Sequence, residues 1–147
     1  MERTLAILMA AVAGALMPAQ GAANAWLARR STLAMATFWT HGTAAIILAF
    51  ILLLHPAGRS PWPTLLHAPL PSLLGGVMGV LITWLVAAAV APLGMVAATT
   101  GILVAQVVTA ALLDHFGIMG LDHAPFTLSK GLGGFLLLLG AWLILRK

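Results

Sequence analysis

The chain has 147 residues, of which 62% are hydrophobic and 7% are charged, and its mean hydropathy is +1.09. Because soluble domains usually contain about 25% charged residues, this composition excludes a soluble globular protein and indicates a membrane protein that crosses the bilayer several times. The seven Lys and Arg residues give a net charge of +4 but are scattered singly or in pairs, which excludes a basic patch for nucleic acid; the lack of cysteine excludes disulfides and thiolate chemistry.

Five apolar runs are long enough to cross a bilayer as helices, since a hydrocarbon core about 30 Å thick needs roughly 20 residues. The predicted spans are about residues 5–27, 33–54, 73–90, 93–113 and 127–145. The first run looks like a cleavable signal peptide, but it is near full spanning length, so we expect it to be retained. Residues 55–72, with five prolines, form an interfacial loop, and the third run breaks at Ala91-Pro92. We therefore predict an all-α integral membrane protein in which residues 1–147 form one five-helix domain.

The Lys and Arg residues are divided almost equally between the two faces of the membrane, here named side A, which holds the N-terminus, and side B. Side A carries three of them and side B carries four. They are Arg3, Arg59 and Lys130 on side A, and Arg29, Arg30, Arg146 and Lys147 on side B. Under the positive-inside rule, a difference of one either leaves the orientation to other features or lets the chain insert both ways up. In the second case two inverted copies can pair about a two-fold axis in the membrane plane, as inverted repeats do in many secondary transporters.

Polar side chains occur inside the spans, although no Asp or Glu falls within any of them. A buried amide without a partner costs several kcal/mol, so each such group must find a partner or line a wet cavity. Counting about 1.5 Å per residue, most of them lie within roughly 6 Å of the middle of their spans. The candidate solute-binding set is Gln20, Asn24, His41, Trp84, Thr100 and Gln106, with Gln106 coming from the inverted second copy.

Each of these residues also has a purely structural interpretation. Gln20 and Asn24, four apart on one helix face, can simply hold helices together. His41 is a candidate for proton coupling, because histidine is the side chain whose charge changes near neutral pH, but a neutral histidine bonded to a backbone carbonyl is an equal alternative. Trp84 either lines a cavity or packs as bulk.

The fourth span ends on side A with Asp114-His115-Phe116-Gly117, and Lys130 opens the fifth. Gly117 is suited to a left-handed turn that ends the helix. An acid at a helix C-terminus opposes the helix dipole, so Asp114 needs a cationic partner and Lys130 is the natural one. We expect Asp114, His115 and Lys130 to form a structural latch or, alternatively, a gate.

Small residues mark places where helices approach closely. Gly75 and Gly79 have the spacing of a Gly-x-x-x-Gly motif, and Gly133 belongs to a group of glycines at the start of the last span. They serve either the packing of one chain or the pairing of two. Pro18, in the middle of the first span, predicts a kink.

The same residues resemble a known family. The C-terminal part carries Gly101, Gln106, Asp114-His115-Phe116-Gly117, Leu128-Ser129-Lys130 and Gly133, and the N-terminal part carries Gly14, Pro18, Gln20, Gly21, Asn24, Leu27, Thr37-Phe38 and Gly42. Together they are similar to the YdcZ-like family of small bacterial inner-membrane proteins, in the drug/metabolite transporter superfamily. The resemblance implies a five-helix fold, a multi-pass location in the inner membrane, an exporter role, and antiparallel pairs of identical or sister chains. Two positions depart from it: Lys130 stands in place of an arginine, and Ala105 in place of a glycine.

We therefore expect a secondary transporter that moves a small organic solute by alternating access in an antiparallel dimer. The alternatives are an ion channel formed by such a dimer and an accessory membrane subunit without transport of its own. An enzyme is not expected, since no catalytic triad or metal-ligand spacing occurs in the spans, and neither a cofactor nor a metal is expected. The expected partners are the lipid bilayer, an inverted copy or sister chain, and the solute, but no nucleic acid. Without an embedded acid, a neutral, zwitterionic or weakly charged solute is favoured over a strong cation.

Overall fold

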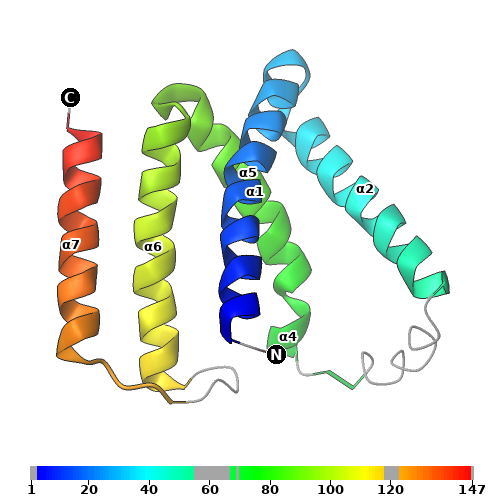
Figure 1. Cartoon of the computed structure of the whole chain (residues 1–147). Helices are drawn as coiled ribbons and strands as arrows, with labels where there is room; N and C mark the ends of the chain where they lie inside the picture. The colour runs from blue at the N-terminus through cyan, green and yellow to red at the C-terminus, as the bar shows by residue number, and fades with distance from the viewer. Residues whose placement is uncertain (1–2, 55–66, 69, 118–122, 147) are drawn as a thin grey trace. The chain divides into compact units, whose positions relative to one another are not determined.

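The computed structural model describes residues 3–54, 67–68, 70–117 and 123–146. Regular structure in these residues is entirely α-helical (Figure 1). The helices are α1 (Arg3–Arg30), α2 (Leu33–Leu54), α4 (Leu70–Leu73), α5 (Gly75–Leu93), α6 (Met95–Phe116) and α7 (Leu128–Leu145). All except α4 are long and apolar enough to cross a membrane, which confirms the prediction of five such helices.

The loop predicted for residues 55–72 is described only at its end, where the single turn of α4 precedes α5. Arg59, which entered the count of charges on side A, and Lys147 on side B lie outside the described residues.

The break after the third span lies later than the sequence predicts. Helix α5 continues through Pro92 to Leu93, and the chain turns at Gly94, whose φ of 78° is open to glycine and strained for other residues. Pro92 lies in the last turn of α5, where its missing N–H leaves the carbonyl four residues earlier without its usual helical partner. The prediction of a break at Ala91-Pro92 is therefore wrong.

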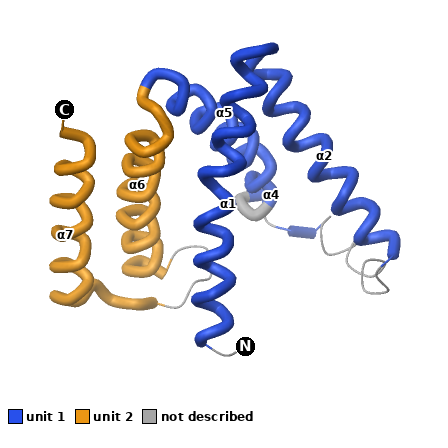
Figure 2. Tube along the Cα trace, turned by 45° about the horizontal axis from the view of Figure 1, so that its top comes forward, with its two compact units in different colours: residues 1–92 blue, residues 93–147 orange. Residues whose placement is uncertain are grey.

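The chain divides into two compact units, residues 1–92 and residues 93–147 (Figure 2). In the first unit α1 and α2 form an antiparallel hairpin around Ser31 and Thr32. The hairpin is fixed at its tip because the Ser31 hydroxyl donates to the Leu27 carbonyl at 2.8 Å and Thr32 Oγ1 accepts from the Met35 N–H at 3.1 Å. Helix α5 of the same unit contacts both α1 and α2.

The second unit consists of α6 and α7 with the connection between them. Helix α6 ends at Gly117, which has a left-handed conformation (φ 59°) and donates its N–H to the Leu113 carbonyl, so the predicted left-handed turn is confirmed. Helix α7 begins at the N-cap Thr127, whose side chain accepts from the Lys130 N–H at 3.3 Å.

Each of the five long helices buries one alanine: Ala25, Ala36, Ala87, Ala98 and Ala141. Large apolar side chains instead point outward, as Leu16, Leu53 and Leu136 do. This is the reverse of a soluble core and suits a bilayer, where lipid covers the large side chains and small ones let helix backbones approach.

Candidate functional site

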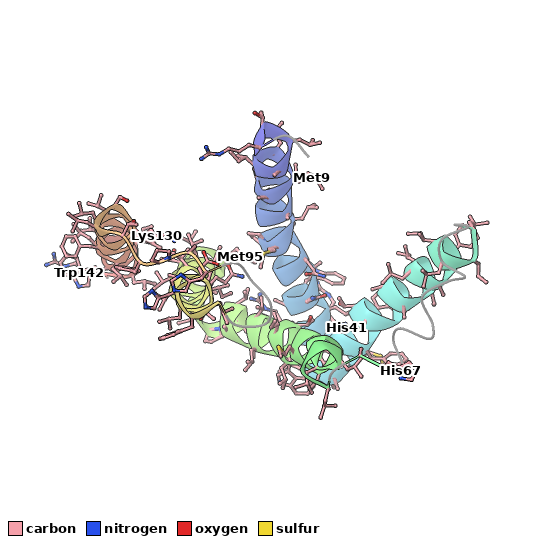
Figure 3. The ribbon with its side chains drawn as sticks, turned by 90° about the horizontal axis from the view of Figure 1, so that it is seen from below. Met9, His41, His67, Met95, Lys130 and Trp142 are labelled. Atoms are coloured by element: carbon pink, nitrogen blue, oxygen red, sulfur yellow. The ribbon has the colours of Figure 1, made fainter. Side chains whose placement is uncertain are left out.

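Polar side chains from all three long helices of the first unit meet inside it. Asn24 of α1 lies against Thr40 of α2, with Asn24 Oδ1 and Thr40 Oγ1 2.7 Å apart. The neighbouring residue His41 places Nε2 3.1 Å from Thr83 Oγ1 of α5. Figure 3 shows His41 where α2 meets α5. These four side chains are named here the three-helix cluster.

The hairpin explains why these particular residues meet. Asn24 and Thr40 lie at nearly equal distances along the chain from the turn at Ser31 and Thr32, so two antiparallel helices bring them to one level. Thr37, Thr40 and His41 are three and four residues apart and therefore share a face of α2. Neither α2 nor α5 contains an acidic or basic residue apart from His41, and in α1 such residues occur only at the ends. The cluster is therefore built from neutral hydrogen-bonding groups around one imidazole.

Asn24 can present either end of its amide to a further partner. Thr40 Oγ1 lies 2.9 Å from the Ala36 carbonyl as well as 2.7 Å from Asn24 Oδ1. Since the hydroxyl has a single proton, it donates to one of these oxygens at a time. When it donates to Ala36, the Asn24 amide is best turned so that its NH₂ group donates to the hydroxyl, which frees Oδ1 as an acceptor. The pair therefore has two states of similar hydrogen-bonding capacity.

His41 reaches Thr83 because α5 has glycine at the point of contact. A Cβ added to Gly79 would lie 3.3 Å from His41 Cε1. The imidazole thus occupies the space that a side chain at Gly79 would take. Its bond to Thr83 forms in either direction, because a hydroxyl both donates and accepts.

Thr37 is the residue that sequence analysis missed. Its side chain is 5% exposed, and its Oγ1 has no hydrogen-bond partner among the described residues. Leaving a buried hydroxyl unpaired costs about 1–3 kcal/mol, which a bound polar group could recover. The signal was its spacing, because Thr37 lies one turn before Thr40 and His41 on the same face of α2.

The structure brings together two of the six predicted solute-binding residues, Asn24 and His41. Gln20 and Gln106 are exposed and make no hydrogen bond within the described part of the chain, and Trp84 is 41% exposed. The Thr100 hydroxyl donates to the Val96 carbonyl of its own helix at 2.8 Å. A role for these four in a site therefore stays a prediction, which for Gln106 depends on a second copy.

The residues of the expected latch all contact the connection before α7, and each does so by a hydrogen bond to one of its main-chain groups. The Asp114 carbonyl accepts from the Ala124 N–H at 2.9 Å. His115 Nδ1 accepts from the Phe126 N–H at 3.3 Å, and Lys130 Nζ donates to the Ala124 carbonyl at 3.3 Å. Within the described residues Lys130 forms no ion pair with Asp114, in contrast to the expected pairing. The carbonyls at the end of α6 and in the connection need partners, and these groups satisfy them.

Among the described residues, Gly79 is the one of the three glycines predicted to serve packing that has a close neighbour. A Cβ at Gly75 or Gly133 would meet no described atom within 4 Å. Close approach also occurs at Gly21, where a Cβ would lie 3.1 Å from Val86 Cγ1 of α5. Gly21 and Gly79 are thus where α5 fits against α1 and α2.

Replacing Gly79 by valine should displace the His41 imidazole and lower the stability of the protein. The expected loss is about 1–3 kcal/mol, the usual cost of overpacking a tight contact. Thermal unfolding in detergent measures it. Gly75→Val is the matched control, because it makes the same change one turn earlier in α5, where nothing lies within 4 Å. Equal losses in the two variants would show that His41 does not fill the space beside Gly79.

Comparison with known proteins gives one match. The family model DMT_YdcZ, with the description "Putative inner membrane exporter, YdcZ", matches residues 5–143 and so covers nearly the whole chain. No curated protein and no solved structure matches the chain. Among the described residues, no group of three or more His, Asp or Glu side chains is placed to hold a metal ion.

Proposed function

Because the chain belongs to the YdcZ family of inner membrane exporters and is a multi-pass inner membrane protein, we propose that it is a secondary transporter that exports a small organic solute. The three-helix cluster is the observation on which this proposal depends. Polar groups inside a membrane are costly: they join helices or, as ionisable side chains such as His41 often do, mark the path of a substrate. Here three helices contribute four such side chains, and a fifth, Thr37, has no hydrogen-bond partner among the described residues.

The solute is a neutral or zwitterionic molecule with its own hydrogen-bond donors and acceptors. The cluster offers an amide, hydroxyls and an imidazole, and no acid of α1, α2 or α5 lies within the membrane to neutralise a permanent cation. A strong cation in a low-dielectric site needs such a counter-charge. A polar neutral molecule instead exchanges hydrogen bonds with Asn24, Thr40 and the unpaired Thr37.

The weakness of the contacts between the helices of the cluster supports alternating access as the mechanism that we propose. One hydrogen bond joins α1 to α2 in the cluster, and one joins α2 to α5. A hydrogen bond that is exchanged for another contributes only about 0.5–1.5 kcal/mol net. Solute binding can therefore open one contact and close another at little cost, which is what two states of similar free energy need.

The working unit is an antiparallel dimer of identical chains or of a chain and its sister. The near balance of Lys and Arg between the two faces supports insertion in both directions. In such a pair the second copy supplies Gln106. Within its own chain this side chain is exposed, and it forms no hydrogen bond with the described residues. An inverted pair also gives the two-fold symmetry on which alternating access commonly depends.

A binding experiment on two threonines of α2 tests the site. Calorimetry with purified protein and a panel of neutral, zwitterionic and quaternary ammonium compounds identifies a ligand. Thr40→Val should then weaken its binding about tenfold or more, because Asn24 loses its partner. Thr43→Val is the control, since both hydroxyls bond to carbonyls of their own helix, but only Thr40 contacts Asn24.

Three outcomes would contradict the proposal. Tight binding confined to quaternary cations would exclude the neutral solute. Equal losses from the two valine variants would remove the cluster from the site. A steady ion current through the reconstituted protein would favour a channel instead.

A further inference from the structure

The ends of α1 and α7 repeat one short pattern that the transport site does not use. Residues 25–30 read Ala-Trp-Leu-Ala-Arg-Arg and residues 141–146 read Ala-Trp-Leu-Ile-Leu-Arg. In both, the alanine is buried and the tryptophan lies four residues before an arginine. The Arg30 guanidinium carbon lies 3.9 Å from the centre of the Trp26 ring, and that of Arg146 lies 5.0 Å from the centre of the Trp142 ring. The same pattern therefore ends both helices, and in the order of the five predicted spans both of these ends fall on side B.

The stacking leaves each guanidinium able to bind an anion. A guanidinium over a ring uses its flat face, while the N–H groups on its edge still point outward in the fork that matches a phosphate. The tryptophans are about half exposed, at 57% for Trp26 and 54% for Trp142, so the pairs lie on the outside of their helices. The carbonyls at a helix C-terminus also favour a cation at this position.

No acidic residue of the chain belongs to the face that holds these arginines. The chain has three acids, Glu2, Asp114 and Asp122, and in the order of the five spans all of them fall on side A. Side B has four Lys and Arg residues and no acid, so its formal charge is +4 and that of side A is zero. No acid of their own chain shares this face with Arg30 and Arg146, so an anionic partner comes either from side A of an inverted second copy or from lipid. At the depth of an interfacial tryptophan the abundant anions are lipid phosphates.

We propose that the Trp26–Arg30 and Trp142–Arg146 pairs bind the headgroup phosphates of anionic phospholipids. The indole lies at the level of the headgroups, and the arginine stacked on it donates its free N–H groups to the phosphate. The net charge of an anionic headgroup adds to this attraction, so phosphatidylglycerol binds better than phosphatidylcholine, which carries its own cation. This assignment is independent of the transported solute.

Native mass spectrometry of the detergent-solubilised protein tests the proposal. In detergent, added lipid reaches both ends of every copy, whichever way the chain was inserted in the membrane. The wild type should retain phosphatidylglycerol in preference to phosphatidylcholine of the same chain length. Arg30→Gln with Arg146→Gln should lower phosphatidylglycerol affinity about tenfold for each arginine lost, while phosphatidylcholine binding changes little. Arg3→Gln, the same change at the other end of α1, is the control and should leave both unchanged.

Two further measurements decide between the explanations. Arg30→Lys with Arg146→Lys keeps the positive charge but loses the planar guanidinium. Its phosphatidylglycerol affinity should lie between those of the wild type and the glutamine variant, and it provides a test even if the glutamine variant folds poorly. Inorganic phosphate at the same concentration should not displace the bound lipid. Full retention of phosphatidylglycerol by a folded glutamine variant would overturn the proposal, and so would displacement by inorganic phosphate.

Discussion

Replacing Arg29 and Arg30 by glutamine should convert the chain, which we propose inserts both ways up, into one that inserts only with side A in the cytoplasm. The wild type has three Lys and Arg residues on side A and four on side B; the double variant has three and two. The variant therefore has more Lys and Arg residues on side A than on side B, and the positive-inside rule places side A in the cytoplasm. With a C-terminal fusion, alkaline phosphatase, which is active only outside the cytoplasm, should gain activity, and green fluorescent protein should become dark.

The opposite change provides the second half of the test. Arg3→Gln with Ser31→Lys leaves two Lys and Arg residues on side A and five on side B, so the C-terminus should stay inside and the reporter pattern should reverse. Each variant expressed alone supplies copies of only one orientation and should form no antiparallel pair. Expressed together with different tags, the two should co-purify and restore solute export to about the wild-type level.

One result would remove the inverted homodimer altogether. If the wild-type chain gives signal with only one of the two reporters, and no sister chain of the opposite orientation is present, then no partner exists to supply Gln106 from the other face. The three-helix cluster would then have to act within a single chain or in parallel pairs, since its contacts need no second copy.

The sequence was sufficient for the number and location of the helices, because crossing a bilayer requires length and apolarity, and both are read directly from the residues. It also predicted the end of α6, since Gly117 combines a helix C-terminus with a residue that tolerates a left-handed turn. The end of α5 was placed too early, because Pro92 was taken as the break. The helix continues one residue past this proline, and Gly94, with its positive φ, is where the chain turns.

For the candidate site, the sequence predicts only how deep in the membrane its residues lie. The rise of about 1.5 Å per residue predicts which polar residues share a level, and it indicates His41, whereas Asn24 is a candidate because it lies four residues from Gln20 on one helix face. It does not predict how each helix is rotated about its axis, because apolar residues cover all faces of these helices. Thr40 and Thr83 are therefore not predicted as the partners, and Thr37 is not predicted as a site residue.

The expected ion pair between Asp114 and Lys130 does not form among the described residues, for a different reason. The prediction that Asp114 pairs with Lys130 rests on the charges of the two side chains. It leaves out the main-chain carbonyls near the end of α6, which also need hydrogen-bond donors. Lys130 Nζ donates to one carbonyl of the connection and His115 accepts from one of its N–H groups. At a helix end these unsatisfied main-chain groups compete with any exposed ion pair, which by itself contributes little.

Substituting His41 by alanine should abolish solute transport driven by a pH gradient while leaving solute exchange intact. His41 is the only histidine of α2 and α5, no charged residue lies beside it in either helix, and histidine is the residue type that most often carries protons in proteins. Its bond to Thr83 is compatible with both forms, because Nε2 donates when the ring is protonated and the threonine hydroxyl can donate when the ring is neutral. The proton can therefore enter and leave without separating α2 from α5, whereas exchange needs only the solute and needs no net proton movement.

Uptake into vesicles, with and without an imposed pH gradient, measures both activities for the solute that the binding panel identifies. His67→Ala is the control, because it removes an exposed histidine that precedes α4 and lies outside the three-helix cluster. Thr83→Val separates coupling from packing, since it keeps the imidazole but removes its partner, and should weaken transport while preserving its pH dependence. If His41→Ala responds to the gradient as the wild type does, the proton is carried elsewhere, and His41 only joins α2 to α5.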